Sequence, residues 1–147
     1  MEIAILGLGC FWGPEIKFNK LDGVIKTEVG YCGGNSSETT YKEVCTGTTN
    51  HAEVVKLDFD PKIISYEKIL KFFFEIHDPT TLNSQGPDFG TQYRSEIFYF
   101  NDQQKEISEK IIKEENIKFS GKVVTKNSLV KNYCPAEEYH QKYLEKR

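Results

Sequence analysis

The sequence lacks the cysteine and histidine spacings that define redox CxxC motifs and zinc sites. Its three histidines stand apart from its four cysteines, which are Cys10, Cys32, Cys45 and Cys134. We therefore expect no bound metal ion. In a reducing compartment the cysteines should be free or catalytic thiols, because structural disulfides are rare there.

Long apolar runs and basic clusters are missing as well. No stretch approaches the ~18 apolar residues of a membrane helix. A net charge of -3 without a basic arm argues against a nucleic-acid partner. The segment from Met1 to Leu6 lacks the basic region of a signal peptide, so we expect a cytoplasmic protein. The 147 residues suit one catalytic domain, 1–147, with a substantial core.

Strand-like and helix-like segments alternate along the chain. Strands are predicted at 3–8, 24–31, 51–59, 95–100 and 123–128. Capping residues and apolar periodicity predict helices at 14–20, 66–77, after Asn101 and from Pro135 to Arg147, with a short turn at 40–45. Residues 78–94 lack periodicity, which is typical of a functional loop. This order predicts an α/β (α+β) two-layer domain.

The pentapeptide Gly9-Cys10-Phe11-Trp12-Gly13 separates the first predicted strand from the first predicted helix. Most free cysteines are small buried hydrophobes. Here the glycines permit unusual backbone angles, and the helix start favours a thiolate through its amides and dipole. Two aromatic rings directly follow the cysteine. The segment therefore predicts a reactive thiol beside an aromatic wall.

Glu53 is the second candidate for chemistry. Strand alternation places it on one face with Val55, Leu57 and Phe59, which is the apolar face. A buried carboxyl group without a cationic partner has a raised pKa and can act as a general acid. The alternative is a strand-end carboxylate that still reaches solvent. His51 fits a hydrogen-bonded structural histidine better than a base, and we also include it among the candidate substrate-binding residues.

Three further residues could complete a site. Asp88 and Tyr93 lie in the long loop, and Tyr41 lies in the short helical turn, although such residues can also shape turns or seal a core. A thiol, a neutral carboxyl, phenol hydroxyls and an aromatic wall suit a substrate with an electrophilic centre, an oxygen to protonate and an apolar group. A sulfoxide meets all three conditions.

Motifs spread along nearly the whole chain carry a family resemblance. They are Gly9 to Gly13 with Glu15, 30–34, Tyr41, Gly47, 51–53, 60–61, 77–80, 85–88, 92–95, 136–137 and 139–141. With these motifs the sequence resembles the A-type peptide methionine sulfoxide reductases, which restore oxidised methionine.

The resemblance implies a fold and a reaction. The fold would be a two-layer domain around a mixed sheet. Cys10 would attack the sulfur of a methionine S-sulfoxide, free or in an oxidised protein or peptide. Glu53, Tyr41 and Tyr93 would act on its oxygen, Asp88 would order the site, and the S-methyl group would bind at Phe11 and Trp12. The products would be methionine and a Cys10 sulfenic acid, consistent with protein repair after oxidative stress.

The resemblance leaves the recycling of Cys10 open. No bound cofactor is implied, and the reductant would be an external thiol such as thioredoxin, glutaredoxin with glutathione, or dithiothreitol. Many members carry a resolving cysteine in a glycine-rich C-terminal tail, which this sequence does not include. An internal disulfide would then use Cys134, which borders a family motif, or Cys32. Direct reduction of Cys10 by an external thiol is equally compatible.

Two smaller points also depend on the resemblance. Cys45 lies where cysteine often occurs in the family without a redox role. Asn50 stands where the family usually has glycine, and asparagine tolerates the left-handed conformation.

Two other functions would use the same residues. A thiol hydrolase would need an imidazole, here His51, within hydrogen-bond reach of Cys10, together with an oxyanion hole. A binding module would hold oxidised methionine without converting it, and its affinity would survive loss of the Cys10 thiol.

Overall fold

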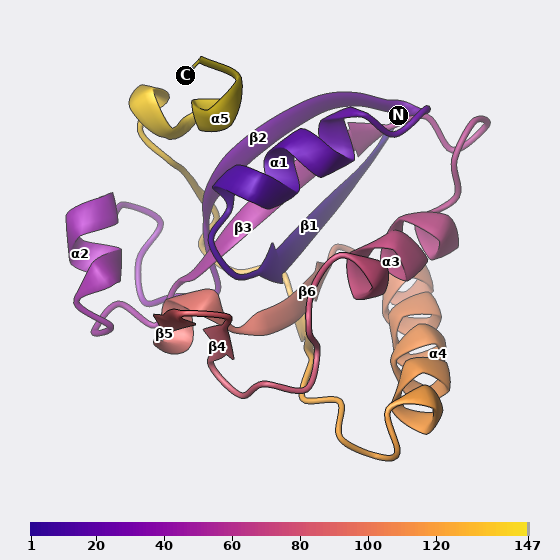
Figure 1. The fold of residues 1–147 in the computed structure, drawn as a ribbon. Helices are drawn as coiled ribbons and strands as arrows, with labels where there is room; N and C mark the ends of the chain where they lie inside the picture. Colours follow the sequence, from indigo (N-terminus) through magenta and orange to yellow (C-terminus); the bar gives the residue numbers. More distant parts are fainter. Residues whose placement is uncertain (147) are drawn as a thin grey trace.

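A six-stranded mixed sheet forms the centre of the molecule (Figure 1). The computed structural model describes residues 1–146, with side chains for residues 1–144. In the order β7-β6-β1-β3-β2-β8, the strands are Lys126–Leu129, Ser95–Tyr99, Glu2–Leu8, Ala52–Phe59, Val24–Cys32 and Cys134–Pro135. The β6–β7 pair is parallel and the other pairs are antiparallel, so the mixed sheet is confirmed.

Two of the helices begin where their capping residues predict, after Ser65 and Asn101, whereas the first helix begins at Trp12, two residues before the predicted start at Pro14. The helices are α1 (Trp12–Asn19), α2 (Tyr41–Cys45), α3 (Tyr66–Glu75), α4 (Asp102–Lys118) and α5 (Tyr143–Lys146). The Ser65 hydroxyl accepts a hydrogen bond from the backbone of Lys68 at the start of α3. At α4 the Asn101 side chain accepts one from Gln104. Each cap satisfies a backbone N–H group that has no partner inside its helix.

The main core lies between one face of the sheet and the helices. Ala4 and Leu6 of β1 and Val55, Leu57 and Phe59 of β3 are buried there with residues of α1, α3 and α4, namely Phe18, Ile69, Leu70, Phe73 and Ile111. Figure 1 shows α1 lying along the central strands. The opposite face holds a smaller cluster of Ile5, Cys32, Ala52, Val54 and Phe98, packed against Val130 and Tyr133. The two-layer prediction is therefore confirmed.

The C-terminal segment differs from the single helix predicted from Pro135. Pro135 pairs with Gly30 in the short strand β8, which the sequence did not reveal. A 3-10 turn, η2 (Glu138–His140), follows, and α5 starts only at Tyr143. Lys142 between them has a φ of 52°, outside the right-handed helix region, so the chain turns there. Arg147 lies outside the described residues.

The long loop carries small elements of its own. β4 (Ser84–Gln85) and β5 (Asp88–Phe89) form a hairpin, and the 3-10 turn η1 (Thr91–Tyr93) leads into β6. The Gln85 side chain accepts a hydrogen bond from the backbone N–H of Asp78 over 3.1 Å and donates one to its carbonyl. In Figure 1 the hairpin lies between α2 and β6. The loop is thus folded onto one end of the sheet.

Candidate active site

Cys10 lies in the tight turn between β1 and α1. Gly9 before it has a φ of 99°, and a Cβ atom there would lie 2.8 Å from the Gln85 side chain. Only glycine combines that conformation with such close packing. Gly13 shows neither feature, because a Cβ atom there would meet nothing within 4 Å. The glycine requirement predicted for both flanks therefore applies to Gly9 alone.

The Cys10 thiol is partly buried, and burial raises its pKa to about 11. A hydrogen bond with the backbone of Trp12 lowers the pKa, as expected at a helix start. The charge of Glu53, when that group is ionised, and the charge of Asp88 raise the thiol pKa further. The helix start thus favours the thiolate, as predicted, but it does not make Cys10 a thiolate in the free protein. Desolvation outweighs the helix amide.

Glu53 is buried in the middle of the site, with 1% of its surface exposed. Its Oε1 accepts a hydrogen bond from the Phe11 N–H over 3.3 Å, while Oε2 has no hydrogen-bond partner among the described residues. Burial raises its pKa to about 8, helped by the charge of Asp88 and opposed by the Phe11 hydrogen bond. The carboxyl group is therefore mostly protonated at neutral pH, as the alternation of β3 predicts.

The two phenols and Asp88 join the thiol and the acid. Tyr93 interacts electrostatically with Glu53, Asp88 and Cys10, and burial raises its pKa to about 12. Burial also raises the pKa of Tyr41, which shares a hydrogen bond with Cys45 and interacts with Glu53. Both phenols therefore remain protonated hydrogen-bond donors. The five residues predicted to be catalytic are brought together by β1, β3, α2 and the long loop.

Aromatic rings gather around Trp12, two residues after the thiol, but the composition of this wall differs from the pair predicted. Phe11 is 1% exposed and belongs to the core, where its ring packs against Tyr31. Trp12 is the half-buried ring, and its Nε1–H donates to Nδ1 of His140 over 3.1 Å. The Tyr143 ring stacks on the Trp12 indole with centroids 3.9 Å apart.

His140 and Tyr143 are site residues that sequence reasoning missed. His140 is 2% exposed and lies between the rings of Phe11, Trp12 and Tyr41. Burial lowers its pKa, so the ring is neutral and its Nδ1 accepts the indole hydrogen bond. The family motif at 139–141 is the signal that could have revealed His140.

His51 supports the backbone near the site. Its Nδ1 accepts a hydrogen bond from the Gly34 N–H over 3.1 Å, and its Nε2 lies 2.7 Å from the Ser36 carbonyl oxygen. A Cβ atom on Gly34 would lie 2.4 Å from the His51 ring, so this position also requires glycine. Both ring nitrogens are occupied. His51 is therefore a structural residue, and its inclusion among substrate-binding residues is corrected.

The other cysteines differ in their relation to Cys10. Cys32 is fully buried, and its thiol donates to the Lys131 carbonyl on the sheet face opposite Glu53. Cys134 and Glu53 both pair with Tyr31, on opposite sides of β2. Two strand spacings separate them by about 10 Å, with the tyrosine between them. Cys45, exposed at the end of α2, is the cysteine that interacts electrostatically with Cys10.

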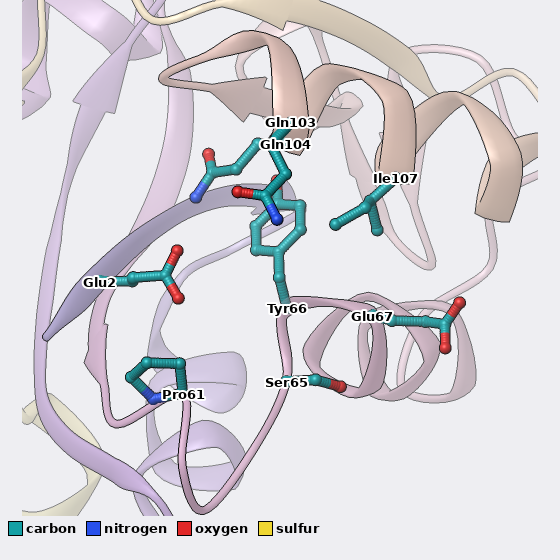
Figure 2. Close-up of a pocket in the computed structure, with 8 residues that line it drawn as sticks. All are labelled: Glu2, Pro61, Ser65, Tyr66, Glu67, Gln103, Gln104 and Ile107. Atoms are coloured by element: carbon teal, nitrogen blue, oxygen red, sulfur yellow. The ribbon is translucent and has the colours of Figure 1, made fainter.

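Other features of the molecule lie away from these residues. A hollow of about 310 Å³ lies at the N-terminal ends of α3 and α4. Glu2, Tyr66 and Gln104 are among the residues that line it (Figure 2). None of the predicted site residues lines it. Within residues 1–146 no cluster of three or more His, Cys, Asp and Glu side chains could hold a metal ion. No helix in the same range combines the length and apolarity needed to cross a membrane.

Comparison with known proteins identifies the family. The peptide methionine sulfoxide reductase family model matches residues 2–147. A peptide methionine sulfoxide reductase MsrA of Pelagibacter ubique is 84% identical over 147 residues, covering 100% of both chains. The reduced form of Mxr1 from Saccharomyces cerevisiae has a TM-score of 0.95 at 43% identity, covering 99% of this chain and 85% of that one.

A second Mxr1 structure contains a partner protein. In complex with Trx2 the yeast protein matches with a TM-score of 0.70 at 28% identity, covering 97% of this chain and 84% of that one. The family match along almost the full sequence agrees with a site that combines a thiol with a protonated carboxyl. The chain belongs to the peptide methionine sulfoxide reductases, thiol-dependent oxidoreductases that reduce methionine sulfoxide to methionine.

Proposed function

We propose that Cys10 is the nucleophile and Glu53 the acid in the reduction of methionine S-sulfoxide. The Cys10 sulfur attacks the sulfoxide sulfur, and Glu53 transfers its proton to the sulfoxide oxygen. The attack forms a bond between the two sulfur atoms. The protonated oxygen is then transferred from the substrate sulfur to the Cys10 sulfur, so the S–O bond of the substrate and the new S–S bond both break, methionine leaves, and Cys10 becomes a sulfenic acid. The thiol proton returns to Glu53. The substrate sulfur is thereby reduced by two electrons and the cysteine sulfur is oxidised by two.

The state of Glu53 is the observation that carries this proposal. Its pKa of about 8 keeps it protonated at neutral pH, and its Oε2 is a buried oxygen without a partner among the described residues. A buried polar atom without a hydrogen bond is unfavourable, so a substrate oxygen that accepts from it gains binding energy. Tyr41 and Tyr93 are protonated donors that interact with the same carboxyl group. Asp88 helps to keep that group protonated.

The thiol pKa of about 11 gives the acid a further task. Few Cys10 side chains are thiolates at neutral pH, so the substrate must be made more electrophilic. Proton transfer to the sulfoxide oxygen achieves this, because it places positive charge on the neighbouring sulfur. Protonation of Glu53 also removes one of the negative charges that raise the thiol pKa. The thiol and the acid therefore act as a coupled pair.

Trp12 is the ring that we assign to the S-methyl group. It is half-buried and follows Cys10 by two residues, whereas Phe11 is buried in the core. An apolar surface that excludes water favours a methyl group and strengthens the hydrogen bonds made on the other side of the substrate.

We propose that an external thiol attacks the Cys10 sulfenic acid directly. The first thiol forms a mixed disulfide with Cys10 and releases water, and a second thiol breaks that disulfide to restore Cys10. The burial of Cys32 and the position of Cys134 behind Tyr31 count against both as resolving cysteines. The Trx2 complex of Mxr1 supports a thioredoxin-like reductant. Glutaredoxin with glutathione, or dithiothreitol, supplies the same chemistry.

The physiological setting follows from this chemistry. Substrates are oxidised proteins, peptides or free methionine sulfoxide, and the enzyme acts as one catalytic domain formed by residues 1–147. We place it in the cytoplasm, where reducing proteins keep its cysteines as thiols.

A single-turnover experiment tests these roles against the two other functions. Reduced protein is mixed with methionine S-sulfoxide without added thiol, and methionine is measured per protein. About one equivalent from the wild type and none from Cys10→Ser is the expected result. Equal methionine release by Cys10→Ser would refute the role of Cys10 as nucleophile. No release by either protein would favour the alternative of a binding module. The hydrolase already lacks its base, because both nitrogens of His51 are occupied.

A further inference from the structure

Glu15 is a buried carboxylate that the reaction does not use. It lies on α1, one helical turn after Trp12, and only 1% of its surface is exposed. Its Oε1 accepts a hydrogen bond from the backbone N–H of Lys142 over 2.7 Å, and its Oε2 accepts one from the Thr27 hydroxyl over 2.9 Å. The Lys142 ammonium lies 4.0 Å from Oε2. A buried carboxyl group requires such partners, and both of its oxygens have one here.

The partner of Glu15 lies within the segment that forms the aromatic wall. Lys142 is preceded by Gln141 and His140 and followed by Tyr143. Its φ of 52° is unfavourable for a non-glycine residue, so the turn must be held by its surroundings. The 2.7 Å bond to Glu15 holds it. Residues on both sides of the turn then contact Trp12. His140 accepts a hydrogen bond from its indole, and the ring of Tyr143 stacks on it.

Gln141 attaches the same segment to the sheet. Its Oε1 accepts from the Val29 N–H over 2.9 Å, and its Nε2 donates to the Val29 carbonyl over 2.9 Å. The amide thus takes the place of a strand residue beside β2, just beyond the end of β8. Gln141 therefore fixes the position of the segment along β2. Glu15 fixes the turn at Lys142, after which Tyr143 packs against α1.

We propose that Glu15 is a positioning residue for the methyl-binding wall. It holds Lys142 in the turn that allows His140 to accept a hydrogen bond from the Trp12 indole and Tyr143 to stack on it. Trp12 and Glu15 belong to the same helix, so α1 both carries the substrate-facing ring and fixes the segment that orients it. This inference rests on the proposed role of Trp12. The acid is held separately, because Glu53 belongs to β3 and is bonded to Phe11.

The test compares three substitutions of buried glutamates. Glu15→Ala leaves the Lys142 N–H and the Thr27 hydroxyl without an acceptor. We expect it to raise KM for methionine sulfoxide about tenfold, with kcat within about twofold, because the indole that binds the methyl group would lose its fixed orientation. Glu15→Gln keeps an acceptor for Lys142, and its amide can donate to the Thr27 oxygen, so KM should return close to that of the wild type. Glu115→Ala, at another buried glutamate on α4, is the matched control.

Tryptophan fluorescence gives a readout that does not depend on activity. Trp12 is the only tryptophan, so all indole emission reports its surroundings. In Glu15→Ala we expect a red shift and faster quenching by acrylamide. In Glu15→Gln and Glu115→Ala both properties should match the wild type. If the proposed function failed while the emission of Glu15→Ala still changed, Glu15 would still be shown to position Trp12. Its effect on substrate binding would then be refuted together with the proposed function.

A milder variant keeps the inference testable if Glu15→Ala does not fold. Thr27→Val removes only the donor to Oε2 and should move KM and emission in the same direction by less. Wild-type KM and emission in a folded Glu15→Ala protein would overturn the inference. So would a loss confined to kcat, or equal changes in Glu115→Ala, since each would indicate a general loss of stability in place of positioning.

Discussion

The backbone N–H of Phe11 donates a hydrogen bond to the Glu53 carboxyl group over 3.3 Å. This bond joins the turn after β1 to the buried face of β3, 42 residues further along the chain. It places the residue that follows the thiol against the acid. It also occupies one carboxyl oxygen and leaves the other to the substrate. The two halves of the first chemical step are thus linked by one backbone contact.

Substitution of Glu53 should separate hydrogen bonding from the loss of the group. Glu53→Gln keeps an oxygen for the Phe11 N–H and an amide that can donate to the sulfoxide oxygen, so we expect a decrease in single-turnover rate of about tenfold or less. Glu53→Ala should lose about 10²–10⁴-fold, the usual contribution of a general acid. Methionine release measured by rapid quench checks both. Rates equal to the wild type in both variants would rule out the acid role.

The raised pKa of Glu53 has a consequence for stability. The pKa is about 8 in the folded protein against 4.5 for a free side chain. Between these values the folded state binds more protons than the unfolded state, so the free energy of unfolding falls as pH rises. The effect is on the order of 4 kcal/mol between pH 4.5 and 8. Relative to Glu53→Gln, the wild type should lose stability across this window in urea unfolding. Parallel pH curves for the two proteins would contradict a buried neutral Glu53.

Removal of the other cysteines tests the recycling route. A protein with Cys32→Ala, Cys45→Ser and Cys134→Ser retains Cys10 and should keep both single-turnover activity and turnover with dithiothreitol. After one turnover without reductant, peptide mapping of the wild type should find Cys10 as a sulfenic acid. Loss of turnover in the variant, together with a Cys10–Cys45 disulfide in the wild type, would show that Cys45 resolves the intermediate. A disulfide to Cys134 would restore the original candidate.

Two glycines of the pentapeptide should respond in opposite ways. Gly9→Ala places a Cβ atom 2.8 Å from Gln85 in a left-handed conformation, and we expect a loss of about 1–3 kcal/mol in the free energy of unfolding. Gly13 lies inside α1 with open space around it. Gly13→Ala should therefore gain about 0.5–1 kcal/mol from helix propensity. Chemical denaturation of the two variants measures both effects, and destabilisation by Gly13→Ala would contradict this account of the turn.

Most of the fold could be predicted because its signals are local. Ser65 and Asn101 each cap a helix by accepting a hydrogen bond from the backbone N–H three residues later. The alternation of β3 assigns Glu53 to the buried face from the strand sequence alone. Asn50 adopts the left-handed conformation expected of it, with a φ of 65°. In each case the physical cause lies a few residues from its effect, so the sequence itself contains it.

The failures concern long-range partners. Pro135, Glu137 and Glu138 look like a helix start, but Pro135 pairs with β2, and Glu137 accepts hydrogen bonds from the Tyr31 hydroxyl and the Tyr41 backbone. Those partners lie about a hundred residues away in sequence, and no local pattern reveals them. The raised pKa of the Cys10 thiol could not be predicted for a related reason. The helix start that lowers the pKa is local in the sequence, whereas the burial that outweighs this effect depends on the tertiary structure.

The hydrogen bond between Trp12 and His140 joins positions separated by 128 residues. Bringing together positions so far apart in the chain costs loop-closure entropy, so contacts of this kind slow folding more than local contacts do. During synthesis the thiol emerges within the first dozen residues and the acid by about the first third of the chain. The segment that orients the indole comes almost last. A growing chain therefore carries its reactive groups long before it has a surface that selects what they meet.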